Sequence, residues 1–344
     1  MNYPLEFYPK IYYNLYENDF ISAGGDDMAS VKDVAERASV SVGTASRALR
    51  NVGYISQEVR GKVLKAAEEL GYVANYSAQQ IRSASSEKTV GIIISESAND
   101  YFFKVIAQLN AKLLPYHYRI LVLYSSAEFE EEEKNFRYLI SNRVSTILFV
   151  PASDQQLHVL SLAHKNDINV IQLFVKAYEN LNTVMNDDEQ GAALAADYLA
   201  GKGCKKILLL DAPYKNFDPA SVSPNRQAGL LHHGGTAEKL VINYDPYSEN
   251  ALEELKNTLA ELQPDGVIAG IGKTGQILAA LIHKGEFSFS FVSFDDNSWF
   301  ENYGITAIKQ GTTRLVDNIC DLILHPKNSP RCFKVEEQLI IRES

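Results

Sequence analysis

From Thr89 onward the chain alternates short apolar runs with amphipathic helical segments, and this alternation constrains the fold more than any other feature. The apolar runs hold four to six residues, as in VGIII, TILFV and GVIAGI. Strand–helix alternation of this kind predicts parallel sheets that helices cover on both faces. The series is too long for one sheet and falls into two similar halves. It therefore predicts an α/β body of two doubly wound parallel-sheet subdomains, with a ligand cleft at the carboxyl ends of the strands.

The last part of the chain is expected to complete both subdomains. The segment TAIKQ, a helix over Thr312–Ile323 and the segment KVEEQLIIR would cross back between them. We therefore predict a body over residues 89–344, with crossings near 185–190, 290–310 and 320–330.

A second pattern lies near the start of the chain, in SVKDVAERASVSVGTASRALR from Ser30 to Arg50. Two helical patterns stand a few residues apart here, and Ser30 with Asp33 can form a capping box for the first. The small residues Ala35, Ala38 and Ala45 let the two helices approach closely at a steep angle. A helix-turn-helix requires this arrangement, because its second helix must enter a DNA major groove. An ordinary helical hairpin is the alternative.

A third helix is predicted from Gln57 to Leu70, which would make an all-α head over residues 28–74. A hinge helix and a polar linker are expected over 75–88, and Asn75 can cap that helix. Residues 1–27 show no convincing periodicity, and we expect a flexible extension or a segment upstream of the start used in the cell. A partner-binding segment is the alternative for this extension.

Charge is divided unevenly along the chain. The net charge is −10, yet residues 28–88 hold nine Lys or Arg and six Asp or Glu, a net charge of +3. A basic head on an acidic body concentrates attraction for phosphate at one end of the molecule. The division therefore supports DNA binding by the head, although a fluctuation over sixty residues could also produce it.

Composition argues against several other classes of protein. No apolar run is long enough for a transmembrane helix, and the first twenty residues do not resemble a secretory signal. The three cysteines are widely spaced and form no CxxC pattern, so a reducing, cytoplasmic location is expected. Neither G-x-S-x-G nor HExxH occurs, and GIGKTG lacks the first glycine of a phosphate-binding loop. The run EFEEEEK at 128–134 is expected to be a solvated helix start. We therefore expect no catalytic residue, no metal site and no cofactor.

An ordered set of motifs resembles the lactose-repressor (LacI) family of bacterial transcriptional regulators over essentially all of residues 29–344. The head motif VKDVAERASVSVGTASRAL resembles the family signature, and GKVLKAAEELGYVANYSAQQI resembles its third helix and hinge. In the body, NDDEQGAALAADYLAGKG, NRQAG, FVSFDDNSW and EEQLIIRES match in order. The resemblance implies a homodimer that binds a pseudo-palindromic operator in double-stranded DNA. It also implies an effector-binding and dimerisation body, with a small-molecule effector between its subdomains.

By position, the resemblance assigns DNA contacts to the second helix of the head. The residues are Ser41, Val42, Gly43, Thr44, Ala45, Ser46 and Arg47. Val42 and Gly43 occupy the family's main base-reading positions, and Gly43 offers no side chain there. Thr44, Ser46, Arg47 and Ile81 of the hinge would therefore carry more of the specificity, while Ala45 could offer a methyl contact to thymine.

The hinge carries a second part of the resemblance. It assigns DNA contacts to Asn75, Ala78 and Ile81, with Ile81 at the place where family members insert an apolar wedge into the minor groove. Such wedges unstack a base step and bend the duplex. Packing of the linker on the body is the alternative for Ile81.

For the effector, the resemblance points to six residues: Tyr101, Phe102, Arg226, Asp295, Trp299 and Gln310. An arginine and a carboxylate from facing subdomains would bind hydroxyls or a charged group, while aromatic rings stack on the ligand. The alternatives are core positions for Tyr101 and Phe102, and an ion pair between Arg226 and Asp295.

Three positions depart from the family pattern. Ile271 and Gly272 stand where an Asn-Asp pair is common, and Lys176 lies near the position of a common arginine. The expected function is nevertheless that of a transcriptional regulator, most simply a repressor, controlled by a sugar or a sugar phosphate. A non-sugar effector or a protein co-regulator stays open as an alternative. A sugar-binding protein without DNA function and an α/β enzyme are the alternatives from other classes.

Overall fold

The computed structural model describes residues 29–49, 53–72, 88–95, 100–125, 129–153, 157–211, 225–327 and 329–343. The chain divides into two compact units, a head within residues 1–84 and a body within 85–344, and each is described by itself. The predicted extension over 1–27, the hinge residues Asn75, Ala78 and Ile81, and most of the predicted linker lie outside the described residues.

The head is a bundle of three short helices. They are α1 Val31–Arg37, α2 Val42–Leu49 and α3 Gln57–Glu69. The predicted capping box starts α1, because Ser30 Oγ accepts from the Asp33 N–H and Asp33 Oδ2 accepts from the Ser30 N–H. Small apolar side chains from all three helices form one core, in which Ala35, Ala45 and Ala66 are buried. These residues let the helices pack as the sequence predicted.

The first subdomain of the body contains a six-stranded sheet in which all strands run parallel, in the order β11-β5-β4-β3-β1-β2. Its strands are β1 Lys88–Ser95, β2 Tyr118–Ser125, β3 Thr146–Phe149, β4 Asn169–Leu173, β5 Asn182–Asn186 and β11 Cys332–Val335. Its helices are α5 Asp100–Leu113, α6 Phe129–Ser141, α7 Val159–Lys165 and α13 Thr312–Leu324, with a 3-10 turn η1 at Leu114–Tyr116.

The second subdomain has a six-stranded sheet of the same form, in the order β12-β10-β9-β8-β6-β7, with only β12 antiparallel. Its strands are β6 Lys206–Asp211, β7 Glu238–Asn243, β8 Gly266–Ala269, β9 Ser290–Phe294, β10 Ala307–Lys309 and β12 Gln338–Ile340. Its helices are α8 Asp188–Gly201, α9 Asn225–His232, α10 Ala251–Leu262, α11 Gly272–His283 and α12 Ser298–Asn302.

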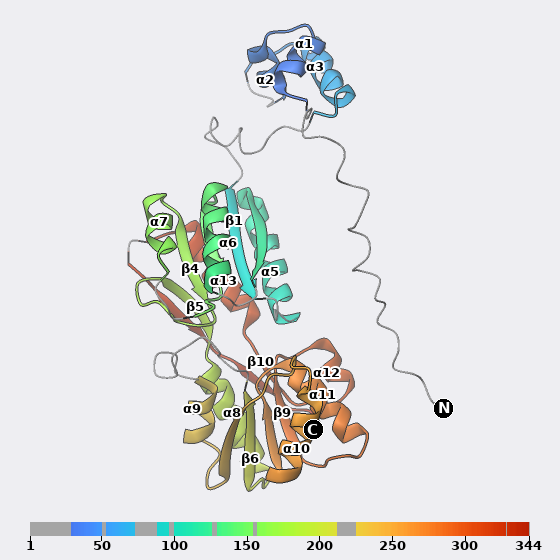
Figure 1. Ribbon diagram of the computed structural model, residues 1–344, viewed down its shortest axis with the longest axis vertical. Coiled ribbons are helices and arrows are strands. Elements are labelled where there is room, and N and C mark those ends of the chain that lie inside the picture. The colour runs from blue at the N-terminus through green and yellow to red at the C-terminus, as the bar shows by residue number, and fades with distance from the viewer. Residues whose placement is uncertain are drawn as a thin grey trace, which may run out of the picture. The chain divides into compact units, whose positions relative to one another are not determined.

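Helices cover both faces of each sheet, as Figure 1 shows for β1 between α5 and α6. Val90, Ile92 and Ile94 of β1 pack against α5 and α13, whereas Ile93 packs against α6 and α7. Alternate residues of a strand point to opposite faces, so a continuously apolar strand must be covered twice. The predicted fold class of the head and the two-subdomain body is confirmed.

The chain passes between the subdomains three times. The first crossing lies at 186–188, within the expected range, and the second at 309–312, at the end of the expected range 290–310. The expectation of a third crossing near 320–330 is wrong, because the chain crosses at 335–338. Residues 320–330 finish α13 and lead into β11, which completes the first sheet before the chain returns to the second.

One residue of the predicted solvated run at 128–134 is buried. Glu132 lies on the inner face of α6 with Phe136 and Leu139, at helical spacings of four and seven residues. Its Oε2 accepts a hydrogen bond from the Ala152 N–H (2.8 Å), and Oε1 has no hydrogen-bond partner among the residues described. Burial raises the pKa of this carboxyl to about 7, and the hydrogen bond from Ala152 opposes the shift.

Among the described residues, none of the helices combines the length and the apolar composition that a membrane span requires.

Because folding raises the pKa of Glu132, its contribution to stability is largest at low pH and falls as pH rises from its ordinary value of 4.5 towards about 7. Glu132→Gln keeps an acceptor for Ala152 and removes the buried charge. We predict that the variant is more stable than the wild type by about 1–3 kcal/mol at about pH 8, and that the difference shrinks towards about pH 5. Urea unfolding across this range measures it. The exposed Glu130→Gln on the same helix is the control, and an equal pH profile for wild type and Glu132→Gln would contradict the assignment.

Candidate functional site

Helix α2 presents most of the predicted DNA-contacting residues on the outside of the head. Val42 and Gly43 are exposed at its start, and Arg47 is exposed one turn later. Ser41 Oγ accepts from the Thr44 N–H (3.1 Å) and lies 2.9 Å from Thr44 Oγ1, so these hydroxyls also cap the helix. Arg47 Nε donates to the Gly43 carbonyl (3.2 Å), which lays the side chain along α2. The exposed face therefore holds one guanidinium, one valine and a glycine that leaves room for close approach.

Ala45 does not belong to this face. It is fully buried among Val34, Ala48 and Val63, where its small side chain allows the three helices to pack. The expected methyl contact between Ala45 and thymine is therefore wrong. The same pattern that made Ala45 an inner residue of the helix excludes it from the outer face.

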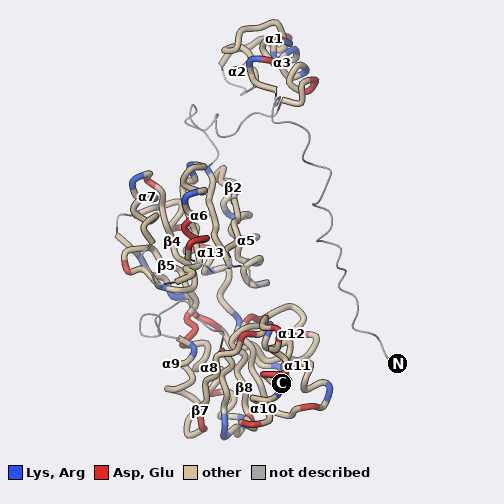
Figure 2. The backbone as a smooth tube through the Cα atoms, in the orientation of Figure 1, with Lys and Arg blue, Asp and Glu red and all other residues tan. Residues whose placement is uncertain are grey.

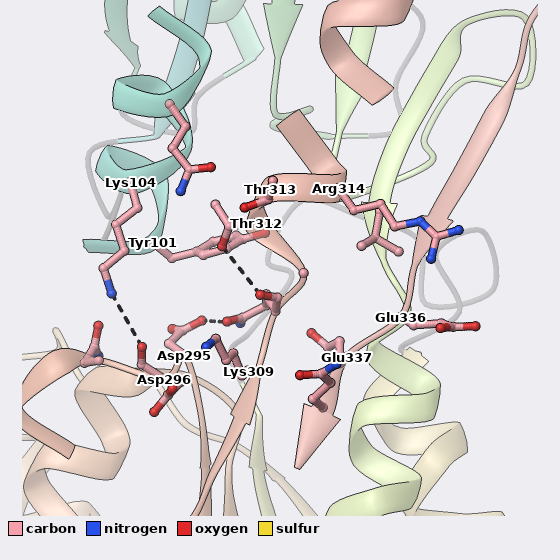
Figure 3. Close-up of a pocket in the computed structure, with 16 residues that line it drawn as sticks. Tyr101, Lys104, Asp295, Asp296, Lys309, Thr312, Thr313, Arg314, Glu336 and Glu337 are labelled. Carbon is pink, nitrogen blue, oxygen red and sulfur yellow. Dashed lines mark hydrogen bonds between the residues drawn. The ribbon is translucent and has the colours of Figure 1, made fainter. Parts of the chain in front are cut away.

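The body contains a polar cleft of about 560 Å³ on the seam between its subdomains (Figure 3). Helix α5, the loop after β9 and the second and third crossings form its walls. The lining residues are Tyr101, Lys104, Gln108, Asp295, Asp296, Asn297, Lys309, Gln310, Gly311, Thr312, Thr313, Arg314, Val335, Glu336, Glu337 and Gln338. Figure 2 shows acidic residues along the backbone in the region where the two subdomains meet. Three predicted effector residues, Tyr101, Asp295 and Gln310, line the cleft.

Asp295 is held by two hydrogen bonds within the second subdomain. Its Oδ1 accepts from Gln310 Nε2 (2.6 Å) and its Oδ2 accepts from the Gly272 N–H (3.0 Å). The backbone of Asp295 is left-handed, with φ of 64°. A Cβ at Gly272 would lie 2.6 Å from Asn297 Nδ2 and 3.2 Å from the Asp295 Cβ, so a larger residue there would displace the Asn297 side chain. Glycine at this position therefore allows Asn297 and Asp295 to pack closely beside the start of α11.

Tyr101 and Phe102 follow each other on α5, and both rings pack against Phe174, but only Tyr101 lines the cleft. The Tyr101 ring also belongs to the buried core of the first subdomain, which was the alternative for this residue. The Tyr101 hydroxyl donates to Asn186 Oδ1 (3.1 Å), and burial together with nearby carboxylates raises the pKa of Tyr101. The Phe102 ring packs edge-on against Phe174 at 4.9 Å, on the margin of the first subdomain's core. Tyr101 therefore presents a neutral hydroxyl at the cleft wall, whereas Phe102 is not among the lining residues and supports the wall from behind.

Arg226 makes an ion-pair cluster inside the second subdomain. Its Nη2 lies 3.2 Å from Asp188 Oδ2, and its Nη1 lies 3.3 Å from Asp211 Oδ1. The guanidinium also lies 4.5 Å from the centre of the Phe294 ring. Arg226 and Asp295 belong to the same subdomain, so the expectation that they face each other across the cleft is wrong. Arg226 is not among the residues that line the described cleft.

Trp299 is likewise absent from the lining residues. Its ring packs against Phe300 (4.3 Å) and Tyr303 (5.8 Å) at the edge of the second subdomain's core. Asp188, Asp211 and Glu337 were not predicted as site residues. Asp211 could have been predicted from the sequence, because it ends the buried strand KILLLD. The carboxyl ends of parallel strands form the edge of the sheet where ligands bind.

Arg226→Ala is expected to destabilise the protein by about 3 kcal/mol or more, because Asp188 and Asp211 would remain buried without their cation. Chemical unfolding at neutral pH measures the loss. Lys176→Ala removes an exposed ion pair with Glu179 and is expected to cost less than about 1 kcal/mol. Equal stability of Arg226→Ala and wild type would contradict a structural role for the cluster.

Two family models match the chain. Residues 30–75 match the model described as bacterial regulatory proteins, lacI family. Residues 87–284 match the model described as periplasmic binding proteins and sugar binding domain of LacI family. The first match covers the helical head, and the second spans parts of both sheets of the body.

Individual relatives and solved structures are similar to the chain in sequence or in fold. The chain is 28% identical to the sucrose operon repressor of Lactococcus lactis subsp. lactis over 307 residues, which cover 86% of this chain and 93% of that repressor. The fold matches a Lac repressor dimer bound to operator and the anti-inducer ONPF, with a TM-score of 0.70, 20% identity and coverage of 91% and 98% of the two chains. It also matches a LacI family regulator from Weissella paramesenteroides with bound sucrose, with a TM-score of 0.65, 19% identity and coverage of 75% and 98%. The chain belongs to the LacI family of bacterial regulatory proteins.

Proposed function

We propose that this protein is a transcriptional repressor that binds a pseudo-palindromic operator as a homodimer and responds to a small molecule in the body cleft. One observation carries the proposal. A single chain joins a head with an exposed second helix to a body whose polar cleft lies on the segments that connect its two subdomains. A solute-binding protein would need the body without the head. We further propose that it acts in the cytoplasm, where it meets chromosomal DNA, and that it binds its ligand without transforming it.

In the head, we propose that α2 of each protomer lies in a major groove and that Arg47 contacts a base edge or a phosphate. The exposed Val42, Gly43 and Arg47 support this placement, since they give α2 a small outer face beside one cationic donor. In the hinge, Asn75, Ala78 and Ile81 are proposed to contact the minor groove. Ser41 and Thr44 would reach phosphates from the capped start of α2, and Ser46 would support them.

In the body, we propose a carbohydrate effector. Hydroxyl groups suit a cleft whose walls supply carboxylates, amides, threonine hydroxyls and ammonium groups. The family model is described as a sugar binding domain, and the relatives include a sucrose operon repressor and a regulator with bound sucrose. Tyr101, Asp295 and Gln310 are the proposed contacts, because the structure brings them to the cleft wall.

The cleft can influence the relative position of the subdomains. Lys104 Nζ of the first subdomain donates to the Asp296 carbonyl of the second (3.4 Å), and both residues line the cleft. A ligand seated here contacts both subdomains and two crossings. It can change operator affinity only through different affinities for the two arrangements of the dimer.

Operator binding by α2 can be tested with an operator selected from a random duplex library. Arg47→Ala should weaken binding by roughly 1–3 kcal/mol if the guanidinium contacts a base. Fluorescence anisotropy at physiological salt measures the change. Arg37→Ala on α1 is the control, because Glu69 already binds that guanidinium at 2.6 Å. Unchanged affinity of Arg47→Ala would remove Arg47 from the contacts.

The effector site can be tested on the same operator complex. A panel of sugars is screened for release of the operator from the wild-type protein. Asp295→Ala should lose the response to an active sugar while it keeps its operator affinity, since Gln310 and Gly272 lose the carboxylate that orders this wall. Glu130→Ala, on the exposed face of α6, is the control. A fully responsive Asp295→Ala variant would contradict the proposed contact.

A further inference from the structure

Glu337 is a buried carboxyl group on the third crossing, between β11 and β12. Its backbone is fixed by the Gln190 side chain, which accepts from the Glu337 N–H (2.8 Å) and donates to the Glu337 carbonyl (3.2 Å). The residue is 2% exposed, and among the described residues neither carboxylate oxygen has a hydrogen-bond partner. Gly191 leaves room for the carboxylate, since a Cβ there would overlap Oε2. Buried polar atoms are almost always paired, so these two oxygens call for donors.

The charges around Glu337 are mostly negative. Asp187 and Asp188 approach it from α8 and Asp295 from the loop after β9, while Arg226 of α9 is the opposing cation. Burial, followed by Asp188, raises the pKa of Glu337 well above its ordinary value, and Arg226 opposes the shift. Burial first, and then the negative charge of Glu337, raise the pKa of Tyr101 on α5.

Arg226 is already shared within the cluster. It contacts Asp188 Oδ2 and Asp211 Oδ1, and Asp188 Oδ1 is buried with no partner in the described part of the chain. Burial raises the pKa of Asp188 as well, against the attraction of Arg226. Asp188 and Asp211 thus share the guanidinium directly, and Glu337 is the third carboxyl group whose charge it opposes.

None of the cationic side chains that line the cleft donates a hydrogen bond to the Glu337 carboxylate in the described part of the chain. Lys104 donates to the Asp296 carbonyl, and Lys309 is exposed. Figure 3 draws Asp295 and Glu337 on the second-subdomain wall of the cleft, one on each side of the second crossing, with Arg314 above Glu337 at the start of α13. This part of the cleft, defined by Glu337 and Asp295 and here called the acidic end, has surplus negative charge and two unpaired acceptors, both on Glu337.

We infer that the acidic end of the cleft binds a cationic amino group, so that the effector is an amine-bearing ligand of the amino-sugar class. The inference rests on the proposed function, since it takes the cleft as the effector site. An ammonium group brings N–H donors and a positive charge to the two unpaired carboxylate oxygens of Glu337. A phosphate group would add negative charge there. Where the Glu337 carboxyl is protonated in the empty cleft, binding of the ammonium ionises it and releases one proton to solvent.

The test is titration calorimetry of the full chain with D-glucosamine, D-galactosamine and D-mannosamine. Each amine is compared with its parent hexose, its N-acetyl derivative and the corresponding hexose 6-phosphate. At least one amine should bind more tightly than its neutral and phosphorylated counterparts. At a pH where Glu337 is protonated in the empty cleft, the heat of binding should also vary with the ionisation enthalpy of the buffer, because one proton is then released. Glu337→Gln should weaken binding of that amine by roughly tenfold or more.

Glu132→Gln is the matched control, because it removes an equally buried carboxyl group from the first subdomain outside the cleft. It should keep the wild-type affinity for the amine. If Glu337→Gln fails to fold, the wild-type protein still tests the inference. Its affinities for the amines and for their N-acetyl derivatives show whether the cationic amino group is needed for binding.

Two results would overturn the inference. Neutral hexoses or hexose phosphates that bind as tightly as the amines, with affinity unchanged in Glu337→Gln, would refute the cationic site and leave the cleft as the effector site. No binding by any probe, in a protein that still binds its selected operator, would refute both the cationic site and the sugar effector.

Discussion

The pairing of Arg226 with two buried carboxylates is the interaction on which the site end of the second subdomain depends. Asp188 begins α8 and Asp211 ends β6, so the guanidinium joins a helix start to a strand end beneath the ring of Phe294. Carboxylates in this position would repel each other and resist burial without a shared cation. The third crossing packs on the same helix α8, where Gln190 binds the Glu337 backbone and Gly191 leaves room for its carboxylate. Arg226, which the family resemblance assigned to the ligand, also opposes the negative charge of Glu337.

The crossings give the cleft its second property, which is contact with both subdomains. Residues 309–312 and 335–338 belong to connections that leave one sheet and enter the other, and both connections line the cleft. Gln310 on the second crossing donates a hydrogen bond to Asp295, and the Gln190 side chain binds the backbone of Glu337 on the third crossing. A molecule bound in the cleft would therefore touch both of these connections between the subdomains. Under the proposed function, this contact would link occupancy of the cleft to the arrangement of the dimer.

Much of the fold could be predicted from the sequence, because apolar runs and helical periods are local signals. The two parallel sheets, the three-helix head and the capping box at Ser30 all follow from such patterns. The third crossing could not be placed, because α13 and β11 return to the first sheet, and that choice depends on partners far away in the sequence. Glu132 appeared solvated because its neighbours are acidic, although its spacing to Phe136 puts it inside. The roles of Arg226 and Glu337 depend on residues contributed by other elements, which no local pattern records.

Under the proposed function, the cleft and the operator-binding head are energetically coupled. The most direct test uses a ligand that binds the wild-type dimer, with operator affinity measured in its absence and at saturation, and ligand affinity measured with and without operator. We expect both affinities to change by the same factor, because coupling between two sites is reciprocal. A ligand that fills the cleft while operator affinity stays unchanged would contradict it.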